Sequence, residues 1–456
     1  MKVIILSAGI GSKLWPYSDN MPKSTIPIAN KPLISLLVDG LEKLGQTEIY
    51  IVVGYFKEDI KYALKDKKHI KFIEQKKQEG TAEAVDEAIE LIGRTDDLLV
   101  IYGDVLISPQ DLEFFINETR SSRLLALVEP LTYERSQDWI CADINDKEQI
   151  VSIKGHAREA THRLCGVYFI GKEFLPYIEK TPAIMRSVPV GGMPPKELEL
   201  AQTFQMMIED GLEVKAFEVK NFFVDLDKPW HILEANRKYI KFLTESIDKD
   251  VVPSSSSVSK EAHIEGHVVL GENSQIGPRV VVMGNLIVGK NTIITNGTIF
   301  TGPAVVGDDC FIYNYPQIGS YTSIGNGCHI GHCAEIEGVF FDRVYVVHYS
   351  ELYGVFGYSV DIGAATVCGT LRFDDLEAQH KIKGRRERPL TDADATYIGN
   401  FSRTGVNAIT MPGVKVGSYS LIGPGVIVYE DIPSHTLVLA KQDVTKSSWG
   451  PERYGW

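Results

Sequence analysis

The chain has 456 residues, which is enough for two or three domains. Hydrophobic residues make up 44% and charged residues 23%, as in an ordinary globular protein, and the formal net charge of -13 argues against binding to nucleic acid or to an anionic membrane surface. No apolar run reaches the roughly 18 residues that a membrane-spanning helix needs. The six cysteines form no Cys-x-x-Cys pair, so we expect them to be reduced in a cytoplasmic protein.

The loop after the apolar N-terminal run, itself expected to be a buried parallel strand, carries the first chemical signal. Gly9 and Gly11 let the backbone turn sharply and approach a ligand closely. Successive N–H groups in such a loop form an anion-binding concavity, and Lys13 and Lys23 add two cations that suit a triphosphate. A turn that needs glycine only for packing is the alternative. Leu14 stands where the Gly-x-Gly-x-x-Gly fingerprint of a dinucleotide-binding site would have its third glycine, so we do not expect a Rossmann dinucleotide site here.

Helix and strand patterns alternate from residue 1 to about residue 245. We expect helices at 33–44, 58–64 and 82–92, and strands at 48–53, 70–73 and 98–102. This alternation predicts an α/β doubly wound sheet, in which ligands bind outside the carboxyl ends of the strands. The loops that follow three of the strands, near Ser7, Gly80 and Gly103, therefore converge on one crevice.

The segment from Gln75 to Thr81 opens one of these helices. The Gln75 amide can both donate and accept hydrogen bonds, as the edge of a nucleotide base requires. Gly80 permits close stacking, and Thr81 can cap the helix. An ordinary polar loop with a helix cap is the alternative.

Asp104 and Asp225 each end a short apolar strand. Two carboxylates beside a triphosphate suit one Mg²⁺ ion, which takes few protein ligands and leaves room for phosphate oxygens. The alternative is that each aspartate only caps a helix.

The pattern Ser7-Ala-Gly-Ile-Gly-Ser-Lys-Leu-Trp-Pro, followed by Pro22-Lys23 and Pro27-Ile-Ala-Asn-Lys-Pro-Leu, resembles the signature of the sugar-1-phosphate nucleotidylyltransferases. The resemblance implies that a sugar 1-phosphate attacks the α-phosphorus of a nucleoside triphosphate, with UTP or dTTP favoured, and that pyrophosphate leaves. It implies catalytic roles for Lys13 and Lys23 and an Mg²⁺ held by Asp104 and Asp225. The nucleotide-binding positions that it implies are Ala8, Gly9, Gly11, Gln75, Gly80, Thr81 and Gly103. Two departures are Ser12-Lys13 in place of Thr-Arg, and Asp227 in place of a glycine.

The sugar-binding motifs of that family are less regular in this chain. The stretch Asp138-Trp-Ile-Cys-Ala lacks the usual glycine, and the stretch around Lys154 lacks the usual glutamate. Lys154 and Gly166 are the sugar-binding candidates, although Lys154 is equally compatible with a solvated loop. The insertion at 186–195 is interpreted either as a flap over the sugar or as a plain surface loop.

From Ile264 to Ile336 an aliphatic residue or phenylalanine occupies every sixth position, and the register resumes from Ile398 to Val428. A sustained period of six predicts a solenoid of short stacked strands. It resembles the left-handed parallel β-helix of hexapeptide-repeat proteins, which implies a homotrimer or a dimer of trimers. We therefore divide the chain into two domains, a nucleotidylyltransferase domain at 1–228 and a β-helix at 263–440. A connecting helix and serine-rich linker at 229–262 joins them. A loop excursion at 371–397 interrupts the β-helix, and a tail follows at 441–456.

Over nearly its whole length the chain resembles archaeal-type two-domain nucleotidylyltransferases and their bacterial uridylyltransferase/acetyltransferase relatives. That resemblance implies acetyl-CoA as a second co-substrate, with His348 as the base that deprotonates an amino sugar. Glu337, Glu351 and Thr370 depart from the family pattern around it. Lys381 and Lys383 are interpreted as a source of a loop lysine or as a solvated charge run. Three alternatives stay open: a β-helix that only trimerises the catalytic domains, a non-catalytic regulatory subunit, and a hexapeptide acetyltransferase with an inert first domain.

Overall fold

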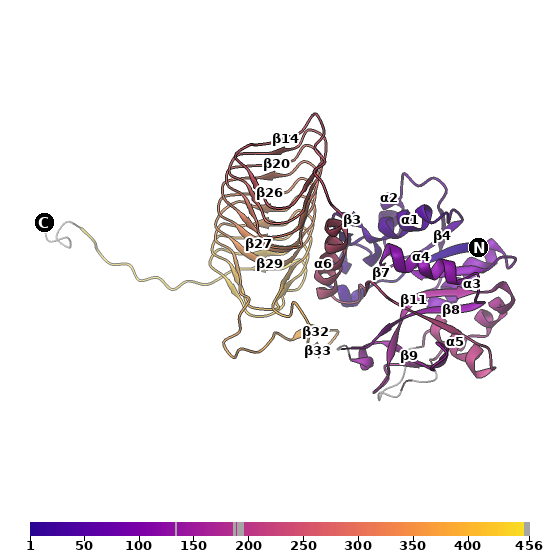
Figure 1. Ribbon diagram of the computed structural model, residues 1–456. Helices are drawn as coiled ribbons and strands as arrows, with labels where there is room; N and C mark the ends of the chain where they lie inside the picture. Colours follow the sequence, from indigo (N-terminus) through magenta and orange to yellow (C-terminus); the bar gives the residue numbers. More distant parts are fainter. Residues whose placement is uncertain (133–134, 186–187, 189–195, 451–456) are drawn as a thin grey trace.

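The computed structural model describes residues 1–132, 135–185, 188 and 196–450, in an α/β domain that lies beside a β-helix (Figure 1). The predicted insertion at 186–195, apart from Val188, and the last six residues of the predicted tail lie outside this description. Helix α6 (Trp230–Glu245) lies between the two parts. Within the described residues, no helix has the length and apolar character needed to cross a membrane.

The centre of the α/β domain is a parallel sheet with the strand order β5–β4–β1–β6. These strands are short and mostly buried, because helices cover both faces of the sheet. Their bounds are β1 (Lys2–Ser7), β4 (Ile49–Val53), β5 (Lys71–Glu74) and β6 (Leu98–Tyr102), and the helices between them are α1 (Leu33–Lys43), α2 (Lys57–Ala63) and α3 (Thr81–Ile92). The helices and strands predicted in this region are therefore present, with ends that differ by a residue or two.

Beyond β6 the sheet becomes mixed, because β11 (His162–Ile170) pairs antiparallel with β6. The strands on that side are β8 (Leu124–Pro130), β9 (Ile140–Ile144), β10 (Ile150–Gly155) and β12 (Lys215–Glu218), and the helices are α4 (Pro109–Glu118) and α5 (Leu200–Glu209). A separate antiparallel pair, β7 (Val105–Ile107) with β13 (Phe223–Asp225), crosses the end of β6. The last residue of this pair, Asp225, thereby comes beside Asp104.

The C-terminal part is the predicted left-handed parallel β-helix, running from β14 (Ser257–Val258) to β40 (Leu437–Val438). Partner residues on successive coils are 18 positions apart, as in Val268 paired with Leu286, so three hexads make one coil. The hexad aliphatics form the buried interior. Between β27 (Glu335–Phe340) and β29 (Glu351–Phe356) the spacing falls to 16, which explains why the period of six ends after Ile336.

The serine run expected to be a linker is bonded into the first coil. The Ser257 amide donates to the Ser274 carbonyl at 3.0 Å, and the Ser256 hydroxyl donates to the Gly271 carbonyl at 2.7 Å. The first strand of the β-helix, β14, therefore lies within the segment that was expected to be a linker.

The two domains share an apolar core rather than meeting through a flexible linker. One buried cluster joins Leu14 and Tyr17, in the segment after β1, to Val339 and Phe341 of the β-helix. The Tyr17 hydroxyl also donates to the Val355 carbonyl at 2.7 Å. Within the excursion, the hairpin of β32 (His380–Ile382) and β33 (Arg385–Glu387) extends from the β-helix to the α/β domain (Figure 1).

Candidate active site

A cavity of about 100 Å³ lies where β1 and β6 end, at the carboxyl edge predicted for ligand binding. Its walls come from the glycine loop, the segment around Lys23 and the turn after β6; they are Leu6, Ser7, Gly9, Gly11, Pro22, Lys23, Ser24, Gly103 and Asp104. Within the described residues, the buried hydroxyls of Ser7 and Ser24 have no hydrogen-bond partner. Because buried hydroxyls are normally paired, these two groups suit a ligand with oxygen acceptors.

Two glycines of this cavity are required by packing. A Cβ on Gly11, whose φ is 67°, would lie 2.4 Å from Cγ of Lys23. A Cβ on Gly103 would lie 1.9 Å from the Ser7 hydroxyl oxygen. A Cβ on Gly9 would meet no atom within 4 Å, so this glycine leaves open space in front of the loop. Ala8 is buried behind the loop, where its carbonyl accepts from the Gln78 amide at 3.0 Å.

Lysines and aspartates from distant parts of the chain form the charged floor of the site. The Lys23 ammonium lies 3.2 Å from Oδ2 of Asp104 and 3.4 Å from Oδ1 of Asp227. Asp227 also contacts Lys13 at 3.2 Å and Lys228 at 2.9 Å. The sequence pointed to Asp227 only as a departure from a family motif, and Lys228 was not identified, although it directly follows Asp227.

The carboxylates differ in how easily they ionise. Burial raises the pKa of Asp225 to about 7, and the neighbouring Asp104 adds to the effect. Burial also opposes ionisation of Asp227, but Lys23, Lys13 and Lys228 outweigh it and hold the pKa of Asp227 well below its usual range. Burial works against the charge of Lys23, yet the Asp104 and Asp227 carboxylates raise the Lys23 pKa above its ordinary value. Lys23 is thus a fixed cation at neutral pH.

Asp104 and Asp225 fit the requirements of one Mg²⁺ ion. Asp225 pairs with Val105 across the β7–β13 ladder, and the Leu226 amide donates to the Asp104 carbonyl at 2.9 Å, so the two carboxylates lie side by side. Within the described residues, no cluster of three or more His, Cys, Asp or Glu side chains is arranged to hold a metal without further ligands. A pair of carboxylates that leaves the remaining positions to phosphate oxygens is the arrangement that Mg²⁺ accepts.

The segment from Gln75 to Thr81, predicted to bind the base, differs from the expectation in the role of Thr81 at the helix end. Gly80, with φ 137°, packs against the backbone of residue 198, where a Cβ would lie 2.4 Å from the carbonyl oxygen. Gln75 donates to Glu83 on α3. Thr81 does not cap α3, because Gly80 holds the cap position. The Thr81 hydroxyl instead accepts from the Leu200 amide at 2.8 Å, so it satisfies a free N–H at the start of α5.

Neither of the two predicted sugar-binding residues lines the cavity at the ends of β1 and β6. Lys154 is ion-paired with Asp143 at 2.6 Å on the outer strands. Gly166 has φ 66° and packs against Tyr102, where a Cβ would lie 2.7 Å from the ring. Tyr102 is the last residue of β6 and precedes the turn that carries Asp104.

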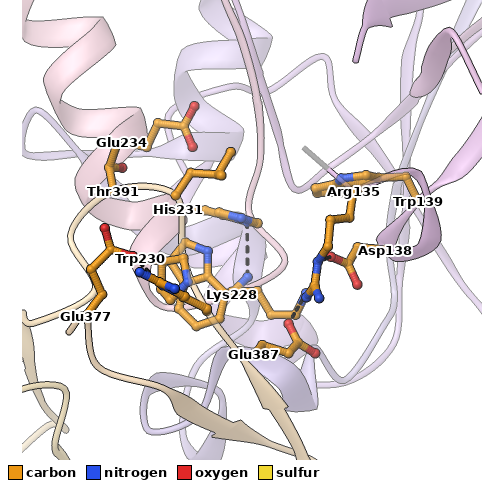
Figure 2. A pocket seen from close by; sticks show the side chains of 13 residues that line it. Arg135, Asp138, Trp139, Lys228, Trp230, His231, Glu234, Glu377, Glu387 and Thr391 are labelled. Atoms are coloured by element: carbon orange, nitrogen blue, oxygen red, sulfur yellow. Dashed lines mark hydrogen bonds and ion pairs between the residues drawn. The ribbon is translucent and has the colours of Figure 1, made fainter. Parts of the chain in front are cut away.

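A larger cavity of about 420 Å³ opens beside Asp227, between the two domains (Figure 2). Trp139 lies on one side of it, and the start of α6 and the excursion lie on the others. Lys228 spans the floor, where it pairs with Glu387 at 3.1 Å, and both side chains are nearly buried. Arg163 stacks on Trp139 at 4.2 Å. Sequence reasoning gave no signal for Glu387, because its contact depends on how the domains dock.

His348 lies on the surface of the β-helix, with its ring 5.7 Å from that of His332. A cavity of about 350 Å³ runs along a neighbouring face of the β-helix, and His348 does not line it. Its walls include the three residues that depart from the family pattern, Glu337, Glu351 and Thr370. Lys381 and Lys383 lie elsewhere, on the hairpin that contacts the α/β domain.

The chain thus joins an α/β domain, with a glycine loop at the carboxyl edge of its sheet, to a packed β-helix, which is the architecture of two-domain nucleotidyltransferases. The chain belongs to the nucleotidyl transferase family, which it matches over residues 2–241, and residues 267–302 match the bacterial transferase hexapeptide family (six repeats). It is 31% identical to the bifunctional protein GlmU of Methanocaldococcus jannaschii, over 97% of this chain and 98% of the relative. It is 29% identical to the bifunctional sugar-1-phosphate nucleotidylyltransferase/acetyltransferase of Sulfurisphaera tokodaii, over 95% and 98% of the two chains. Its structure also aligns with that of a UDP-glucose pyrophosphorylase at a TM-score of 0.45 and 18% identity, covering 53% of this chain and 98% of the other.

Proposed function

We propose that this enzyme transfers a nucleotidyl group from a nucleoside triphosphate, with UTP or dTTP preferred, to the phosphate of a hexose or N-acetylhexosamine 1-phosphate. The observation that carries the proposal is the convergence of Lys23, Asp104 and Asp227 beside the glycine loop. The relative from Sulfurisphaera tokodaii, which is named as a sugar-1-phosphate nucleotidylyltransferase, supports the choice of acceptor.

In the proposed reaction, an oxygen of the sugar phosphate attacks the α-phosphorus of the nucleotide. The bond from the α-phosphorus to the bridging oxygen breaks, and pyrophosphate leaves with the electron pair. No protein nucleophile is needed, so the side chains act by positioning and by neutralising charge. Lys23 supplies a fixed positive charge, and Lys13 a second one at the outer end of the loop. Asp104 and Asp225 would hold Mg²⁺, which adds positive charge at the phosphates.

The glycine loop and the Gln75–Thr81 segment are proposed to bind the nucleotide, with Gly103 keeping the strand ends close together. The cavity beside Trp139 is proposed to take the sugar, since an aromatic face and several hydrogen-bonding groups surround it. Gly166 is proposed to contribute indirectly, because it packs against the Tyr102 ring and holds that ring in place. Sugar binding by Lys154 is also proposed, but the position of Lys154 does not support that role, because its ammonium group is already paired with Asp143.

The test is a pyrophosphate-release assay with the full chain and Mg²⁺, over a panel of nucleotides and sugar 1-phosphates. We expect turnover with UTP or dTTP and at least one hexose or N-acetylhexosamine 1-phosphate. Asp104→Asn removes one proposed metal ligand, so it should lower kcat by at least about a hundredfold. Asp66→Asn, at an exposed turn, is the matched control and should keep full activity. Absence of turnover with every pair would refute the proposal.

A second activity, acetyl transfer from acetyl-CoA to an amino-sugar phosphate, is proposed for the β-helix. The cavity that Glu337, Glu351 and Thr370 help to line offers carboxylates that would attract the ammonium form of an amino sugar. His348 does not line this cavity, so its proposed role as the base rests on the family resemblance alone. The relative from Sulfurisphaera tokodaii is also named as an acetyltransferase. Release of the free thiol from acetyl-CoA, abolished in His348→Ala, is the expected result. If His348→Ala retains full activity, the proposed base is wrong.

The regulatory alternative has one observation in its favour: the Asp227 carboxylate already contacts three of the lysines that a phosphate would need. The panel assay separates this alternative from catalysis. The β-helix is further proposed to assemble a homotrimer or a dimer of trimers, which sedimentation of the full chain would measure.

A further inference from the structure

Another cavity lies on the outer side of the glycine loop, and four of its seven lining residues are lysines. Its volume is about 160 Å³, and its walls are Ser12, Lys13, Trp15, Lys381, Ile382, Lys383 and Lys415. Three separate segments contribute: the nucleotide loop, the β32–β33 hairpin and strand β37 (Lys415–Val416) of the β-helix. All the titratable side chains in its walls are therefore cationic.

The hairpin is held against the α/β domain by several specific contacts. Ile382, between the two exposed lysines, is buried in the cluster that contains Leu14 and Tyr17. His380 packs on Trp230 with ring centroids 5.2 Å apart. At the other end of the hairpin, Glu387 pairs with Lys228 at 3.1 Å. The hairpin therefore presents Lys381 and Lys383 to the nucleotide loop as part of one packed structure.

The lysines of this cavity are only partly neutralised by the protein itself. Lys13 pairs with Asp227 at 3.2 Å, and the buried Lys415 pairs with Asp431 at 2.8 Å. Within the described part of the chain, Lys381 and Lys383 have no carboxylate within ion-pair distance. Cations gathered around one small space repel one another, and an anion with several negative oxygens removes that repulsion.

We infer that Lys381 and Lys383, which belong to the C-terminal domain, bind the terminal phosphates of the nucleoside triphosphate together with Lys13 and so hold the departing pyrophosphate. The inference rests on the proposed function. It is supported by continuity: Ser12 and Lys13 follow directly on Gly11, which lines the cavity that contains Lys23 and Asp104. The α/β domain alone would then lack part of its phosphate site, and the β-helix would take part in nucleotidyl transfer.

Binding of pyrophosphate to the full chain, measured by titration calorimetry, tests the inference without requiring turnover. The double variant Lys381→Ala/Lys383→Ala loses two charge-assisted contacts, so it should bind pyrophosphate at least about tenfold more weakly and show a raised KM for the nucleotide. Lys381→Arg/Lys383→Arg keeps both charges and should bind like the wild type. Arg385→Ala/Arg386→Ala removes the same charge from the paired strand of the same hairpin, outside the cavity, and should change binding by less than about twofold.

Three results would overturn the inference. One is unchanged pyrophosphate binding in the lysine double variant. Another is an equal loss in the arginine control, which would indicate a general effect of charge. The third is pyrophosphate binding at this cavity that does not compete with the nucleotide, which would indicate a separate anion site. If wild-type protein releases no pyrophosphate in the panel assay, the proposed function fails. The calorimetric titration still shows, independently of turnover, whether Lys381 and Lys383 bind pyrophosphate.

Discussion

The Lys23 ammonium lies 3.2 Å from the Asp104 carboxylate, although 81 positions separate the two residues in the chain. Lys23 comes from the segment after the glycine loop, and Asp104 from the turn after β6. Their contact is made by neighbouring parallel strands that end at the same edge of the sheet. It gives the site a fixed cation next to a carboxylate that suits a metal, and the proposed nucleotidyl transfer uses both.

Gly11→Ala should displace Lys23. The new Cβ would lie 2.4 Å from Cγ of Lys23, so we expect kcat/KM for nucleotidyl transfer to fall by about a hundredfold, as for a small misplacement of a catalytic group. Gly45→Ala is the matched control, since Gly45 has a similar left-handed φ of 78° but no atom within 4 Å of its Cβ. Both variants should lose stability, and only Gly11→Ala should lose activity. Equal activity in the two variants would contradict the account.

Asp227→Gly should strengthen nucleotide binding. The Asp227 carboxylate contacts Lys13, Lys23 and Lys228, so an incoming phosphate must compete with it. We expect KM for the nucleotide to fall by about three- to tenfold, on the scale of one charge-assisted contact. The Tm without ligand should also fall, because three lysines lose their shared partner, and pyrophosphate should restore it. A raised KM would mean that Asp227 itself contributes to ligand binding.

The domain junction should depend on Lys228 and Glu387. Both side chains are nearly buried, and they pair at 3.1 Å. Glu387→Gln should lower the free energy of unfolding by about 1–3 kcal/mol, less than for an isolated buried pair because Lys228 keeps Asp227 as a partner. A double-mutant cycle with Lys228→Met should give a coupling energy of about 1 kcal/mol or more in urea unfolding. A coupling energy near zero would show that the pair does not hold the domains together.

The pH prediction concerns His380 on the hairpin. Burial, with Lys415 adding to it, lowers the pKa of His380 to about 4, while the Ala393 carbonyl, 2.7 Å from Nε2, opposes the shift. The unfolded chain therefore binds a proton at His380 more readily than the folded chain does. The contribution of neutral His380 to the free energy of unfolding is complete above pH 6.5 and is lost as the pH falls towards 4. The total loss is about 3 kcal/mol. Lys415 and its partner Asp431 are the charged groups that face the ring.

The comparison of His380→Gln with wild type isolates this effect. Asp225 and Glu199, whose pKa values burial raises to about 7, act in the opposite direction in both proteins and cancel in the difference. Urea midpoints measured from pH 7 to pH 4 should show the variant losing less stability than wild type. Parallel curves for the two proteins would refute the assignment.

The elements that could be predicted from the sequence are those whose signals are local. The hexads from Ile264 to Ile336 predicted the β-helix because each turn packs only on its neighbours. The glycine loop and Asp104 could be placed at the carboxyl edge of the sheet because each directly follows a strand, and both line the cavity there, while their roles toward a phosphate stay predictions. Thr81 was assigned to the wrong helix, because its actual partner at Leu200 is 119 positions away. The hairpin lysines could not be placed, since their position depends on the docking of two domains.

The most direct test of the central claim is a crystal structure of the full chain with Mg²⁺ and a nucleotide analogue that cannot release pyrophosphate. The account predicts one metal ion that contacts Asp104 and Asp225, with the triphosphate against Lys13 and Lys23. A nucleotide bound in another cavity, or a triphosphate that does not reach both aspartates, would contradict it.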